Sequence, residues 1–92
     1  MPKYVIEREI PGIGNKSGEE LSAVAKNSRR VLEQLGPGIQ WVESFITENK
    51  VYCIYIADNE DIIREHSKLA GVPVHNIAKI KTMMDPTTAE GL

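Results

Sequence analysis

Four side chains in this 92-residue sequence have the chemistry of metal ligands or reactive groups, namely Cys53, His66, Glu43 and Glu7. The Cys53 thiol could bind a transition metal or react as a thiolate, or it could be a small buried hydrophobe. His66 could act as a ligand or a general base, or could simply bond to a backbone carbonyl. Glu43 and Glu7 occupy segments with the pattern of strands. A carboxylate there either faces solvent or serves a function, because burying it without a partner costs several kcal/mol of free energy.

The spacing of these residues along the chain does not assemble a site by itself. His66 and His75 are not at the i, i+4 spacing that lets one helix present two imidazoles to one ion. A metal site would therefore have to form across several elements or across two chains. The sequence has no Ser/His/Asp or CxxC arrangement and favours a non-enzymatic protein. One enzyme hypothesis is an isomerase in which Pro2, exposed by removal of Met1, acts as a base, as in tautomerases.

Hydrophobic periodicity predicts the elements that must position these residues, in the order β-α-β-β-α-β. This order is typical of a ferredoxin-like α+β fold, a four-stranded antiparallel sheet with two helices on one face. We expect one domain over 1–86 and a flexible tail over 87–92. The expected strands cover 3–10, 39–47, 50–57 and 76–84; the first helix runs from a Ser17-to-Glu20 capping box to Gly36, and the second from a cap at Asp58 or Asn59 to Gly71.

The central strands carry apolar side chains on both faces, more than a lone sheet should expose to water. We therefore predict a homodimer in which two sheets pack face to face around a cavity or a dry core. The sequence does not decide which face lies under the helices. The two sets on strand 50–57 are Val51, Cys53 and Tyr55 on one side and Tyr52, Ile54 and Ile56 on the other.

The turn between the two middle strands sets their register. A turn of two or four residues would place Ser44 beside Cys53 and Val42 beside Tyr55 on one face. Trp41, Glu43 and Phe45 would then lie on the opposite face, beside Ile56, Ile54 and Tyr52.

Composition excludes several classes of protein. A net charge of −2 without a basic cluster argues against nucleic-acid binding, and no apolar run is long enough for a transmembrane helix. One cysteine excludes an internal disulfide and a multi-thiolate zinc site. The N-terminus lacks the features of a signal peptide, so we expect a cytoplasmic protein.

Several segments together resemble a family of small bacterial domains of unknown function that includes a nickel-binding protein. The pattern is a Tyr-Cys-x-Tyr strand, then a helical Glu-His and a Gly-x-Pro, and the similarity covers essentially residues 3–86. The segments are Tyr4–Arg8, Trp41–Thr47, Asn49–Tyr55, Arg64–His66, Gly71–Pro73 and Asp85–Pro86.

This resemblance implies a ferredoxin-like fold that pairs into a dimeric α/β barrel, and nickel binding in at least one member of the family. We therefore expect this protein to bind a transition metal, with nickel as the first candidate. The candidate metal ligands are His66, Cys53 and Glu43; members of the family often carry histidine at the position of Glu43. The candidate pocket residues are Trp41, Tyr55 and Glu7. The alternatives are a small-molecule binder or an isomerase- or monooxygenase-like enzyme using the barrel cavity, and a scaffold with no ligand.

Overall fold

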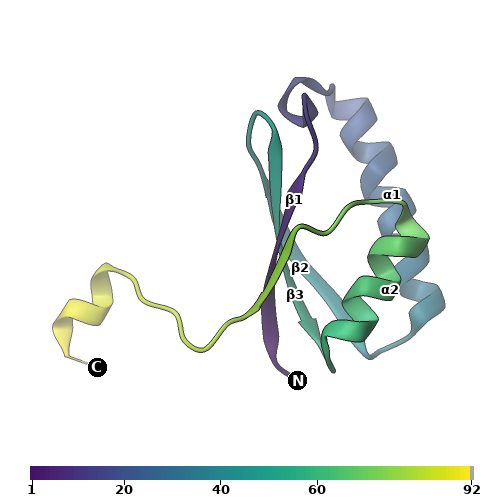
Figure 1. The fold of residues 1–92 in the computed structure, drawn as a ribbon. Coiled ribbons are helices and arrows are strands. Elements are labelled where there is room, and N and C mark those ends of the chain that lie inside the picture. Colours follow the sequence, from purple (N-terminus) through teal and green to yellow (C-terminus); the bar gives the residue numbers. More distant parts are fainter. Residues whose placement is uncertain (92) are drawn as a thin grey trace.

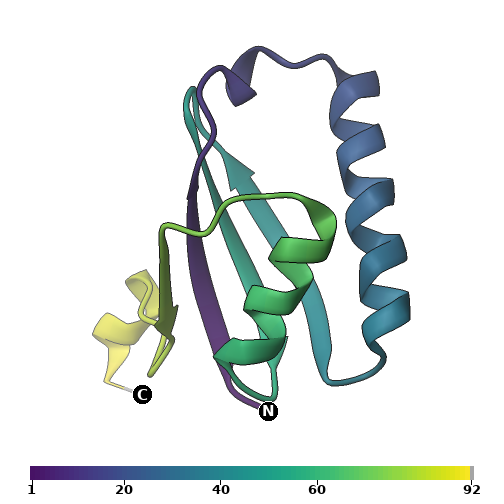
Figure 2. The same ribbon diagram turned by 45° about the vertical axis from the view of Figure 1, so that its right-hand side comes forward.

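Residues 1–91, described by a computed structural model, form a four-stranded antiparallel sheet with two helices on one face (Figures 1 and 2). The strands lie side by side in the order β2-β3-β1-β4, which confirms the predicted βαββαβ fold. None of the helices formed by these residues is long and apolar enough to cross a bilayer. The elements are β1 (Lys3–Glu9), η1 (Ile13–Asn15), α1 (Gly18–Leu35), β2 (Ile39–Ile46), β3 (Lys50–Ala57), α2 (Glu60–Ala70), β4 (Asn76–Lys79) and η2 (Pro86–Glu90).

The ends of both helices follow local capping chemistry. The Ser17 hydroxyl accepts from the Glu20 amide and the Glu20 carboxylate accepts from the Ser17 amide, so the predicted capping box is present. Asn59 caps α2 by accepting from the Ile62 amide. Gly71 ends α2 in the left-handed conformation, at φ 74°. These contacts confirm both predicted helices and select Asn59 over Asp58 as the second cap.

A β-bulge changes the predicted pairing of β2 with β3. Glu43, Ser44 and Phe45 oppose Ile54, Cys53 and Tyr52 as expected. The register then shifts between Trp41 and Glu43, so that Trp41 opposes Tyr55. The predicted pairs of Val42 with Tyr55 and Trp41 with Ile56 are therefore wrong, because the bulge inserts one extra residue into β2.

The last strand is shorter than the predicted 76–84. β4 ends at Lys79, and its pairing with β1 runs from Tyr4–Lys79 to Glu7–Asn76. The Ile80 amide still donates to the Lys3 carbonyl, but β1 begins at Lys3, so later residues have no strand to pair with. The chain after Ile80 instead leads away from the sheet to η2 (Figure 1). Leu92, the end of the predicted tail, lies outside the described residues.

The helices decide which face of the sheet becomes the core. β3 alternates strictly, with Val51, Cys53, Tyr55 and Ala57 buried under the helices. Neither α1 nor α2 covers the opposite face, which we call the outer face (Figure 1). Its apolar residues are Val5, Phe45, Tyr52, Ile54 and Ile56, of which the Phe45 side chain is 55% exposed.

The loop between β1 and α1 gives a first testable prediction. A Cβ added at Gly14 would lie 2.7 Å from the Thr47 carbonyl oxygen and 2.8 Å from the Glu48 Cα. Both atoms belong to the backbone, so Gly14→Ala is expected to lower the free energy of unfolding by about 1–3 kcal/mol, measured by urea denaturation. Gly18→Ala is the matched control, since its Cβ would meet nothing within 4 Å. Equal urea midpoints for Gly14→Ala and the wild type would contradict this close approach.

Candidate functional site

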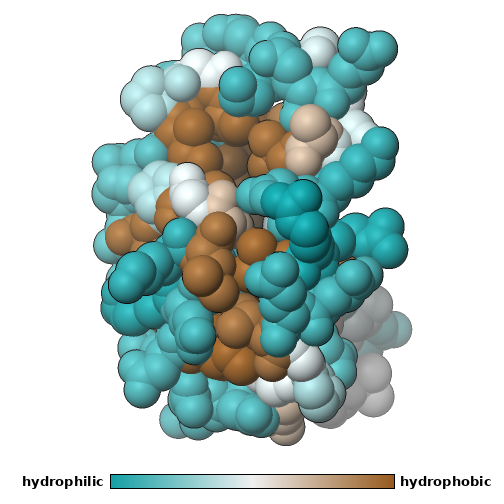
Figure 3. Space-filling model, turned by 90° about the vertical axis from the view of Figure 1, so that its right-hand side faces the viewer, coloured by the Kyte–Doolittle hydropathy of each residue, from teal (hydrophilic) through white to brown (hydrophobic). Residues whose placement is uncertain are grey.

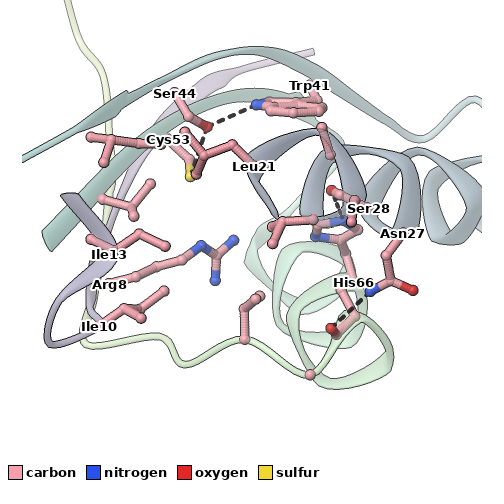
Figure 4. Close-up of a pocket in the computed structure, with 18 of the residues that line it drawn as sticks. Arg8, Ile10, Ile13, Leu21, Asn27, Ser28, Trp41, Ser44, Cys53 and His66 are labelled. Carbon is pink, nitrogen blue, oxygen red and sulfur yellow. Dashed lines mark hydrogen bonds between the residues drawn. The ribbon is translucent and has the colours of Figure 1, made fainter. Parts of the chain in front are cut away.

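A pocket of about 590 Å³ lies between the two helices and the sheet. Its volume falls in the range of small-molecule sites, and most of its lining is aliphatic or aromatic. Figure 3, which views the helix side, shows hydrophobic side chains left open between hydrophilic ones. Among its polar side chains are Arg8, Asn27, Ser28, Ser44 and His66 (Figure 4).

The structure divides the predicted site residues between the two faces of the sheet. His66, Cys53, Trp41 and Tyr55 line the pocket. Glu43 opposes Ile54 and Glu7 opposes Tyr52, so both carboxylates belong to the outer face. The predicted ligand set therefore does not converge within one chain: His66 and Cys53 lie on one side of the sheet and Glu43 on the other. Pro2 and His75 are likewise absent from the pocket lining.

Cys53 is held on the pocket wall by a chain of hydrogen bonds. The Trp41 indole N–H donates to the Ser44 hydroxyl over 2.9 Å, and that hydroxyl donates to the Cys53 sulfur over 3.0 Å (Figure 4). The bulge in β2 makes this possible because it turns Trp41 toward the helix side. Cys53 is thus a buried free thiol with a fixed position.

His66 is a buried imidazole with one unpaired nitrogen. Its Nε2 lies 3.0 Å from the Ser28 hydroxyl of α1, whereas Nδ1 is buried without a hydrogen-bond partner. Burial, and secondarily the Arg8 charge, lowers the pKa of His66 to about 4. The ring is therefore neutral at pH 7, the form in which histidine binds metals.

Arg8 is a pocket residue that the sequence did not single out. It is only 3% exposed, and its guanidinium projects into the pocket from β1 (Figure 4). Nη1 donates to the Ser67 hydroxyl and the Pro73 carbonyl, each over 2.9 Å, and Nη2 lies 3.5 Å from the Tyr55 hydroxyl. The available signal was the period of two in β1, which puts Arg8 on the same face as Tyr4 and Ile6.

Comparison with known proteins places this fold in a family. The model of the SCO4226-like family, described as nickel responsive protein SCO4226-like, matches residues 4–80. The chain belongs to the SCO4226-like family. A search of curated proteins found no match. The crystal structure of SCO4226 from Streptomyces coelicolor A3(2) superposes with a TM-score of 0.74 at 10% identity, covering 89% of this chain and 99% of that one.

The residues of this SCO4226-like chain fit nickel in kind but are too few. Imidazole and thiolate are donors that nickel accepts, and His66 has an unpaired buried nitrogen. However, no three His, Cys, Asp or Glu side chains gather into a metal cluster within residues 1–91. The Arg8 charge in the same pocket also opposes a bare cation. One chain alone therefore does not form a complete nickel site.

Proposed function

We propose that the protein is a cytoplasmic homodimer that binds nickel, with donors from outside the single chain completing the site. His66 would supply a nitrogen and Cys53 a sulfur. The observation that carries this proposal is the buried, neutral His66 ring with its unpaired Nδ1 in a chain of a nickel-responsive family. A cytoplasmic location suits a free Cys53, since cytosolic thiols are kept reduced.

The outer face supports the homodimer. Its side chains Val5, Tyr52, Ile54 and Ile56 are only partly buried, and Phe45 is mostly exposed. A contiguous apolar surface of this kind favours association, and a second sheet of the same shape would cover it. Such a pair of sheets is the dimeric α/β barrel expected from the sequence. It would also bring Glu43 and Glu7 of one copy close to the other copy.

A calorimetric titration of nickel into chelator-treated protein tests the proposal. We expect binding by the wild type and a loss of at least about tenfold in affinity for His66→Ala and for Cys53→Ser, since each removes one metal–ligand bond. His75→Ala is the matched control, because it removes an exposed imidazole that lies outside the pocket. Absent binding, or equal binding by all four proteins, would contradict the assignment.

The pocket itself favours a second candidate function, the binding of a small organic molecule. The supporting observation is an apolar space of about 590 Å³ in which a few polar groups converge. Retention of an organic molecule through purification, detected by native mass spectrometry, would support this function. The two candidates are separable, because a chelator removes nickel and leaves an organic ligand in place.

A further inference from the structure

The charge of Arg8 has no acidic partner among the residues that the structure describes. Each of its three acceptors, the Ser67 hydroxyl, the Pro73 carbonyl and the Tyr55 hydroxyl, is an uncharged oxygen. Burial raises the pKa of Tyr55 to about 12, so its phenol remains neutral at pH 7. Buried charges in proteins are normally paired, and an unpaired guanidinium at 3% exposure is therefore a feature that needs a cause.

The carboxylates next to Arg8 in β1 form ion pairs with other residues. Glu7 and Glu9 both lie on the opposite side of the strand from Arg8 and pair with Lys50, at 3.2 Å and 3.8 Å. Glu9 also lies 3.6 Å from the His75 Nε2. No ion pair within residues 1–91 includes Arg8. The anion that complements Arg8 must therefore come from outside this part of the chain.

The pocket offers both a place for an anion and a place for hydrocarbon. A guanidinium has five N–H donors, and the three protein acceptors leave donors free. Figure 4 shows the guanidinium between Ile10 and Ile13 on one side and His66 on the other. Leu21 and Val24 of α1 extend the apolar lining toward solvent, where the Val24 side chain is 44% exposed. The buried Nδ1 of His66, another residue that lines the pocket, has no hydrogen-bond partner within the described chain.

We propose that this pocket binds a small organic carboxylate, with its carboxylate against Arg8 and its hydrocarbon part along Ile10, Ile13 and Leu21. The inference rests on the second candidate function, ligand binding in the pocket, and not on nickel. The carboxylate neutralises the buried guanidinium through a charge-assisted hydrogen bond. The apolar lining contributes affinity through burial of the hydrocarbon part, which a free inorganic anion lacks.

Two probes of equal chain length, one with a charged carboxylate and one with a neutral hydroxyl head group, test this inference. Octanoate and octan-1-ol are titrated into chelator-treated protein by calorimetry, with the emission of Trp41, the single tryptophan, reporting from the pocket wall. We expect octanoate to bind about 10–100-fold more tightly than octan-1-ol, the range of a hydrogen bond to a charged group. In Arg8→Met this preference is expected to disappear. Arg64→Met is the matched control, because it removes the same charge from an exposed position of α2 and keeps the preference.

A second variant keeps the test decisive if Arg8→Met does not fold. Val24→Phe adds bulk at the open end of the pocket and is expected to weaken both probes together. Equal affinity of the wild type for the two probes would overturn the carboxylate assignment while leaving pocket binding standing. Binding of neither probe at millimolar concentration would overturn both.

Discussion

Acidification from pH 7 to pH 4.5 is expected to cost the protein about 2–3 kcal/mol of stability through His66 alone. The pKa of this ring falls from an ordinary 6.5 to about 4, first because it is buried and then because of the Arg8 charge. Each unit of difference between the unfolded and folded pKa values corresponds to about 1.36 kcal/mol of folding free energy. Between these two pH values the unfolded chain takes up a proton at His66 that the folded chain refuses. The stability is therefore fully present above pH 6.5 and is lost as the pH falls toward 4.

Urea denaturation at pH 7 and at pH 4.5 measures this loss, and His66→Gln isolates it. The variant places a non-titrating, polar carboxamide where the ring was, so its stability should fall by about 2–3 kcal/mol less than that of the wild type. An NMR titration gives a direct check, since the C2 proton of His66 should not move between pH 7 and pH 5.5. A ring that titrates near 6.5 in the folded protein would contradict the assigned burial.

Local chemistry explains why much of the fold could be predicted. The Ser17 and Glu20 capping box and the Gly71 stop are signals contained in a few neighbouring residues, and each forms as expected. The alternation of β3 over Lys50–Ala57 likewise fixes which side chains share a face. These features depend on adjacent residues, so the sequence alone contains what is needed to identify them.

The β2 bulge and the end of β4 depend on information that local patterns lack. A bulge adds one residue to a strand without a distinctive side chain, and here it moves Trp41 from the outer face to the pocket. The strand β4 ends at the point where β1 has no further residues to pair with. The residue types of the following segment, such as Thr82 and Met83, do not indicate where this end lies. Both differences are visible only in how a strand pairs with its neighbour.

The candidate site was predicted only in part for the same reason. Cys53, Tyr55, Trp41 and His66 drew attention by residue type, and all four line the pocket. Arg8 did not, although its position in β1 follows Tyr4 and Ile6 in the period of two. Its acceptors Ser67 and Pro73 lie 59 and 65 positions away along the chain. The burial of the Arg8 charge can be identified only from these distant hydrogen-bond partners, and the sequence alone does not show that they lie close to Arg8.

A charged side chain introduced on the apolar outer face should dissociate the proposed homodimer into single chains. Ile54 lies on this face in the inner strand β3, where it pairs with Val5 of β1 on one side and with Glu43 of β2 on the other. Ile54→Lys is expected to be tolerated in a single chain, where the ammonium can reach water beside Glu43. In the dimer the same ammonium would be buried against a second sheet, so we expect dimer affinity to fall by more than about 100-fold. Light scattering should then give the 10.3 kDa of one chain instead of twice that mass.

The same variant separates assembly from nickel binding. A copy packed on the outer face is divided by the sheet from His66 and Cys53 in the pocket, so monomeric Ile54→Lys should bind nickel with wild-type affinity. Leu69→Lys is the matched control, since it makes a comparable change on the exposed surface of α2, outside the pocket, and should leave both mass and nickel affinity as in the wild type. A wild-type monomer at micromolar concentration would refute the dimer. Loss of nickel binding by monomeric Ile54→Lys would contradict a nickel site confined to the pocket side and show that donors from a second chain are required.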